Sequence, residues 1–156
     1  MASLQRVALF ILFDEMERDL VAKIVEASGN SVACLTKEEN DRARRRINGV
    51  DEEPDITDLL HRLDLGDKIA ILMRLRDKLP TAYSEYIKSK QSDLVRSIPT
   101  RNAVMHGRPL TIQEYALGFK LASDLAKSRS YWPSLASTLK LYNSNPDAIR
   151  ARSIDI

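Results

Sequence analysis

The sequence is poor in the residues that build turns, disulfides and metal sites. Only 5 Gly and 6 Pro occur in 156 residues, so a fold of short strands joined by tight turns is not expected. Cys34 is the single cysteine, which excludes an intrachain disulfide and a cysteine-based metal site. With 2 His and no dense group of His, Asp and Glu, we expect no metal and no other cofactor. This composition is typical of a protein in a reducing cytoplasm.

A long hydrophobic run is also missing. The apolar run near the N-terminus, Val7 to Phe13, is too short to span a bilayer, and acidic residues follow it at once. The preceding residues lack the basic start and the small-residue cleavage site of a signal peptide. We therefore expect a soluble, cytoplasmic protein with no membrane partner.

The two signs of charge nearly balance. Lys and Arg number 24 and Asp and Glu 22, so the net charge is +2, which neither supports nor excludes nucleic-acid binding. The length is that of one ordinary domain. Runs of Ala, Leu, Lys, Arg, Glu and Asp, with few consecutive β-branched residues, predict an all-α fold.

Hydrophobic periodicity predicts a compact helical bundle of about five to seven helices within residues 1–142. The first helix should run from about Ser3 to Ala27 and end at the Ser-Gly-Asn sequence that follows. Apolar residues cover most of its circumference, which indicates a core helix; a contribution to a dimer interface is the alternative. Further helical segments are expected at residues 36–46, 56–63, 67–79, 81–98, 100–106, 111–125 and 132–141. Residues 47–58 are predicted to form a surface loop, and residues 143–156 a polar tail or the start of a linker.

Two capping boxes, Thr36 to Glu39 and Thr111 to Glu114, mark helix starts. The second opens the most amphipathic helix of the chain. Its predicted buried face consists of Ile112, Tyr115, Ala116, Phe119, Ala122 and Leu125. The first opens a polar helix with arginines at positions 42, 44, 45 and 46. Such a run is usually a solvated face, and contact with RNA is the alternative.

Arg101, Asn102 and His106 bring a guanidinium, an amide and an imidazole into one short segment. Asn102 and His106 are four residues apart, so a helix places them on one face. Arg101 lies about 140° around the helix axis from His106, so one copy does not converge on a single substrate atom. Two copies related by a two-fold axis would line a cleft with two Arg and two His.

Such a cleft suits RNA cleavage. His transfers protons near neutral pH, and Arg presents a fixed charge to phosphate oxygens. The N–H groups of a helix that starts after Pro99 would add donors. No metal is needed if the 2′-hydroxyl of the substrate is the nucleophile. The same spacing also arises by accident, and a lone His near a helix end is more often a cap; His61, which has no such neighbours, is taken as structural.

The segment 97–110, S-I-P-T-R-N-A-V-M-H-G-R-P-L, resembles the signature of HEPN domains, the higher eukaryotes and prokaryotes nucleotide-binding superfamily. That motif is an Arg, often followed by a polar residue such as Asn, and a His after a gap of four to six residues. The resemblance extends through the helical layout over about three quarters of the chain. A subset paired with nucleotidyltransferases carries Tyr two residues after the His; this chain has Arg108 there, so modification at that position is not expected.

The resemblance implies a helical bundle that dimerises through the motif helices and cleaves RNA without a metal. Arg101 would bind the phosphate, His106 would transfer a proton or stabilise the leaving oxygen, and Asn102 would orient the His or the substrate. Products with a 2′,3′-cyclic phosphate are expected. The implied setting is toxin–antitoxin, antiviral defence or RNA processing, with an antitoxin or a fused NTPase domain as a possible partner. The residues from Tyr131 to Asp147 also resemble HEPN modules that precede an NTPase domain.

The sequence is also compatible with two alternatives to the homodimeric ribonuclease. One is a non-catalytic HEPN-like dimerisation or RNA-binding module attached to a larger effector. The other is a generic helical adaptor in which the motif is accidental. The adaptor predicts that Arg101 and His106 are buried in salt bridges and face away from any dimer cleft.

Overall fold

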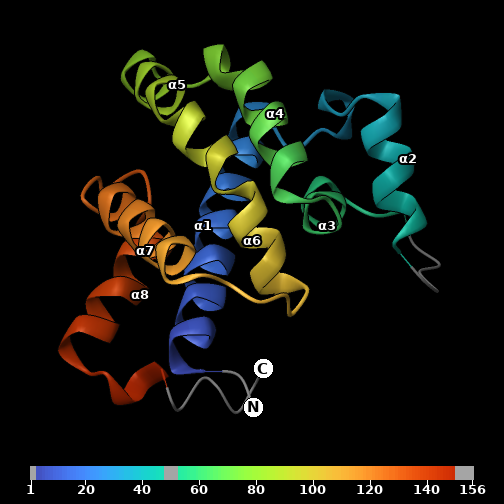
Figure 1. Cartoon of the computed structure of the whole chain (residues 1–156). Coiled ribbons are helices and arrows are strands. Elements are labelled where there is room, and N and C mark those ends of the chain that lie inside the picture. Colours follow the sequence, from blue (N-terminus) through green and yellow to red (C-terminus); the bar gives the residue numbers. More distant parts are fainter. Residues whose placement is uncertain (1–2, 48–52, 150–156) are drawn as a thin grey trace. The chain divides into compact units, whose positions relative to one another are not determined.

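A computed structural model of the chain describes residues 3–47 and 53–149 (Figure 1). All regular structure in these ranges is helical and no strand is formed, so the predicted all-α class is confirmed. The α-helices are α1 (Leu4–Ser28), α2 (Lys37–Arg45), α3 (Ile56–His61), α4 (Leu65–Leu75), α5 (Thr81–Arg96), α6 (Ile98–Met105), α7 (Ile112–Ala126) and α8 (Pro133–Ser144). Two 3-10 helices are η1 (Val32–Cys34) and η2 (Arg76–Lys78).

The helices are more numerous than the predicted five to seven. Besides the eight α-helices, residues 147–149 are also helical. The eight α-helices correspond to the eight segments that periodicity indicates, and even the short ones are separate helices: the side chains of Asp55 and Asp64, for example, accept backbone N–H groups and cap the starts of α3 and α4. Helix α8 also extends to Ser144, so the predicted tail at 143–156 is helical where it begins, and its residues 150–156 lie outside the described ranges.

The chain divides into two compact units. The first unit consists of residues 1–19 and 96–156, and its described helices are the first part of α1 together with α6, α7 and α8. The second unit consists of residues 20–95 and contains the rest of α1, α2 to α4 and nearly all of α5. The predicted site residues all belong to the first unit.

The first part of α1 is buried on nearly every side. Its buried apolar residues are Val7, Ala8, Leu9, Ile11, Leu12, Phe13 and Met16. Successive residues of a helix point in different directions, so this burial extends around most of the circumference, except for the side of Phe10 and Asp14. The prediction of a core helix is confirmed, and α1 ends where expected, with Gly29 and Asn30 at φ values of 62° and 63°.

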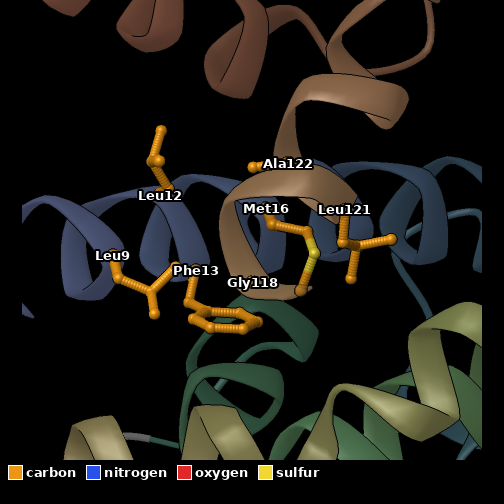
Figure 2. A pocket seen from close by; sticks show the side chains of 7 residues that line it. All are labelled: Leu9, Leu12, Phe13, Met16, Gly118, Leu121 and Ala122. Carbon is orange, nitrogen blue, oxygen red and sulfur yellow. The ribbon is translucent and has the colours of Figure 1, made fainter. Parts of the chain in front are cut away.

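Helix α7 approaches α1 closely at Gly118. A Cβ atom on Gly118 would lie 2.8 Å from Cδ1 of Leu9, so the missing side chain allows this approach. Beside the contact is an apolar cavity of about 10 Å³ between the two helices (Figure 2). It is lined by Leu9, Leu12, Phe13, Met16, Gly118, Leu121 and Ala122. A space this small holds one water molecule at most, and we interpret it as a packing feature because small-molecule sites are far larger.

The buried face of α7 differs from the predicted one. Ala122 and Leu125 are buried as expected, but Ile112 is 85% exposed and Ala116 is exposed as well. All buried residues of α7 lie from Gly118 onward. Periodicity identified an apolar stripe, but it could not show that this stripe is fully buried only in the second half of the helix.

Helix α8 is capped by a carboxylate from α1. The two carboxylate oxygens of Asp19 accept hydrogen bonds from the backbone N–H groups of Ser134, at 3.1 Å, and Leu135, at 3.0 Å. Trp132, at the N-cap position, supplies no side-chain cap of its own. Burial raises the pKa of Asp19, although these hydrogen bonds act in the opposite direction. Asp19 thus fixes α8 to the first part of α1.

Both predicted capping boxes are present, at Thr36 with Glu39 and at Thr111 with Glu114. Glu39 has a second function in the second unit. Its carboxylate accepts a hydrogen bond from Arg74 at 2.8 Å, and the same guanidinium donates to the carbonyl of Cys34. This arrangement connects α4 to the start of α2.

Candidate functional site at the end of helix α6

Helix α6 carries all three predicted site residues. Pro99 lies in its first turn, where a missing N–H costs no intrahelical hydrogen bond. His106 is the C-cap residue, about 12 Å along the axis from the helix start. The N–H groups of the helix start were expected to assist the chemistry, but within one copy they lie at the opposite end of α6 from His106.

Gly107 ends α6 with a left-handed backbone, at φ 68°. The N–H of Arg108 donates to the carbonyl of Ala103 at 2.8 Å, and the N–H of Gly107 donates to the carbonyl of Val104 at 3.5 Å. This pair of bonds is the Schellman motif, which glycine favours because it lacks a Cβ. The backbone of His106 is therefore fixed by local hydrogen bonds.

Arg101 is held by Glu17 of α1. Its Nε donates to Oε2 of Glu17 and its Nη2 to Oε1, each at 3.0 Å. The two side chains are 15% and 7% exposed, respectively. The Nη1 of Arg101 donates to Oδ1 of Asn102 at 3.3 Å. The carboxylate thus offsets the positive charge of Arg101, and the amide oxygen of Asn102 contacts Arg101 instead of His106.

The carbonyl groups at the end of α6 are bound by Arg6 of α1. Its Nη2 donates to the carbonyl of Ala103 at 2.6 Å and to that of Val104 at 3.4 Å. The last carbonyls of a helix carry partial negative charge, which a guanidinium offsets. Arg6 thereby places a positive charge at the same helix end as His106.

His106 and Arg108 are exposed. Across residues 3–47 and 53–149, neither side chain makes a hydrogen bond or an ion pair. The structure therefore brings Arg101 and Asn102 together in a semi-buried network, while His106 stands apart from it at the surface. Arg101 meets the expectation of the adaptor alternative, since it is in a buried salt bridge, and His106 does not.

Glu17 and Arg6 also belong to this site, although the sequence pattern did not predict them. Both were hard to find because their contacts with α6 bridge 84 and 97 residues. One signal was present: Glu17 directly follows Met16 in a helix that is apolar on most sides. A carboxylate in such a position is rarely buried unless it is paired with a cation.

The arginines of α2 are mostly occupied within the chain. Arg42 pairs with Asp67, Arg44 pairs with Glu53, and Arg46 donates to the carbonyl of Arg62. Among the described residues, Arg45 is the member of this run without such a partner. These contacts favour a structural role for most of the run over a contact with RNA.

No group of three or more His, Cys, Asp and Glu residues in the described part of the chain could hold a metal ion. None of the helices in these ranges has the length and apolar character needed to cross a membrane. Comparisons with protein-family models, with curated proteins and with solved structures found no match.

Proposed function

We propose that the chain is a metal-independent endoribonuclease that acts as a homodimer, with a composite Arg/His cleft at the two-fold axis. The observation that carries the proposal is the state of His106. It is exposed, it has no side-chain partner in the described ranges, and its backbone is fixed at the end of α6. An imidazole held in this way is accessible to a substrate and is the side chain best suited to proton transfer near neutral pH.

The reaction needs only groups that RNA and the protein supply. The 2′-oxygen attacks the adjacent phosphorus and loses its proton, the bond from phosphorus to the 5′-oxygen breaks, and that oxygen takes up a proton. The products are a 2′,3′-cyclic phosphate and a 5′-hydroxyl. His106 from each copy would accept or donate these protons, so two copies supply both functions.

In this proposal Arg101 contacts the phosphate, and Asn102, which accepts a hydrogen bond from Arg101, is a positioning residue. A guanidinium carries five N–H groups, and the contacts with Glu17 and Asn102 use three of them. One N–H on each terminal nitrogen is left to face a phosphate. Because the Glu17 carboxylate fixes the plane of the guanidinium, these donors would meet the substrate with little loss of side-chain freedom.

A non-catalytic HEPN-like dimerisation or RNA-binding module is the second candidate, and the Arg101–Glu17 ion pair favours it. A guanidinium whose charge is offset by a buried carboxylate stabilises developing negative charge less than a free one would. In that case Arg101 serves only to join α6 to α1. Both candidate functions fit the same proposed partners, an attached NTPase domain or an antitoxin. Both also fit a role in a toxin system or in antiviral defence.

The test is cleavage of a structured and a single-stranded RNA in EDTA by the wild type, His106→Ala and His61→Ala. His61 is a matched control, because it is also an exposed histidine at the end of a helix, α3. All three proteins are first compared for helicity and for mass in solution. We expect wild type and His61→Ala to cleave and His106→Ala to be inactive. Equal cleavage by all three would indicate a contaminant, and no cleavage by any of them would favour the interaction module.

A further inference from the structure

The Arg101–Glu17 pair leaves open which cation binds the phosphate beside His106. Arg101 lies about 140° around the α6 axis from His106, and its charge is offset by Glu17. The carbonyl end of a helix also repels anions. Within one copy, a phosphate near His106 therefore requires positive charge in addition to that of Arg101.

Arg108 is placed to supply that charge. Its backbone N–H is fixed to the carbonyl of Ala103 by the Schellman motif, one residue beyond Gly107 and two beyond His106. Its side chain is exposed and makes no hydrogen bond or ion pair with any described residue. The connection from Gly107 to Thr111 is anchored at both ends, by this motif and by the capping box of α7.

Arg6 reduces the electrostatic repulsion of an anion at the C-terminal end of α6. Its guanidinium is bonded to the carbonyls of Ala103 and Val104, so it offsets the negative end of the α6 dipole. Arg6 and Arg108 thus bring two positive charges to the helix end that carries His106. Unlike Arg101, neither is paired with a carboxylate in the described ranges.

We propose that Arg108 is a phosphate-binding residue, which holds the RNA backbone beside His106 while Arg6 neutralises the end of α6. This inference rests on the proposed function, because it specifies how the same site would hold RNA. Arginine suits the role since its planar fork can donate two parallel hydrogen bonds to one phosphate. A contact with phosphate carries no sequence information, so Arg108 should strengthen the binding of different RNA sequences equally.

The test measures the binding of two unrelated 2′-O-methyl RNA oligonucleotides, which resist cleavage because their 2′-oxygens carry no proton. The variants are Arg108→Gln, Arg108→Lys and the control Arg129→Gln. Arg129 is an exposed arginine in the same unit, beyond the far end of α7. Helix α7 has 15 residues and is therefore about 22 Å long, with the proposed site before its first residue and the control after its last.

We expect Arg108→Gln to weaken binding about five- to tenfold for both oligonucleotides and to reduce the salt dependence of log K by about one unit. Arg108→Lys should recover part of the loss, and Arg129→Gln should bind nearly as the wild type does. Equal losses for Arg108→Gln and Arg129→Gln, or no binding by the wild type, would overturn the inference. Binding that depends on Arg108 in a protein that cleaves no RNA would support the phosphate site while rejecting the nuclease.

Discussion

Glu17 and Arg101 lie 84 residues apart in the sequence, and two hydrogen bonds of 3.0 Å join the Glu17 carboxylate to the Arg101 guanidinium. Both side chains are largely shielded from water. A pair in this setting is costly to break because the remaining partner keeps a buried charge without compensation. The contact therefore ties the motif helix α6 to the first part of α1.

Glu17→Ala should destabilise the protein by about 3 kcal/mol, because it leaves Arg101 without its counter-charge. Arg101→Met should cost a similar amount for the reciprocal reason. The double variant should lose clearly less than the two single losses combined, since no unpaired charge remains. Urea unfolding of all four proteins measures this coupling. Losses that simply add would show that the ion pair contributes nothing specific.

Glu39 should make stability depend on pH. Burial alone would raise its pKa, but hydrogen bonds from Arg74 and the Thr36 backbone outweigh burial and lower it. A lowered folded pKa means that this contribution is present above the usual glutamate pKa, about 4.3, and is lost as the pH falls through the folded value. Glu39→Gln should lose about 1 kcal/mol at pH 7, since Arg74 is partly exposed.

The same substitution should flatten the acid side of the stability profile, measured by urea unfolding between pH 3 and pH 7. Glu38→Gln is the matched control, because Glu38 is an exposed neighbour in the first turn of α2. It should leave the profile nearly unchanged. An identical profile for wild type and Glu39→Gln would contradict the assigned hydrogen bonds.

Gly107→Ala should destabilise the end of α6 by about 1–2 kcal/mol. No atom beyond the two adjacent residues lies within 4 Å of the added Cβ, so the loss comes from the positive φ. Gly107→Asn should cost less, because asparagine tolerates the left-handed region better than other residues do. Thermal unfolding distinguishes the two variants. An alanine variant as stable as the wild type would mean that the turn can adopt another conformation.

The two halves of α7 should respond differently to truncation. Leu125→Ala removes a fully buried side chain and should cost about 2–5 kcal/mol. Ile112→Ala removes an exposed one, and the change in unfolding free energy should be within about 0.5 kcal/mol. Denaturant unfolding of both variants gives the comparison. A large loss of unfolding free energy for Ile112→Ala in the monomer would show that Ile112 is buried, as the periodicity predicted.

Local signals explain which features could be predicted from sequence. The capping boxes at Thr36 and Thr111 and the end of α1 at Gly29 depend on residues within one turn of each other, and all three are present. The segment from Thr100 to His106 was likewise identified as a short helix, although the helix begins two residues earlier, at Ile98. Neighbouring residues determine these features, so a single sequence contains them.

The features that could not be predicted from the sequence depend on packing between residues far apart in the chain. Whether Ile112 is covered depends on where α1 meets α7, and Gly118 sets that point by a contact with Leu9. The partner of Arg101 is a residue in another helix, which periodicity cannot select from the many acidic residues of the chain. Sequence spacing therefore identified the motif but not how its three members are separated in space.

The Schellman turn after α6 fixes His106 and Arg108 through the backbone alone. Their side chains contribute no internal hydrogen bond or ion pair to the described structure, so most substitutions there should leave folding intact. In a mutational scan scored by cellular abundance, substitutions at these two positions should lower the abundance of the protein little, and substitutions at Glu17 should lower it strongly. If the proposed ribonuclease acts in a toxin or antiviral setting, a scan scored by growth arrest or by protection from phage should give the opposite ranking for His106. The difference between the two maps would then mark the residues needed for activity and not for folding.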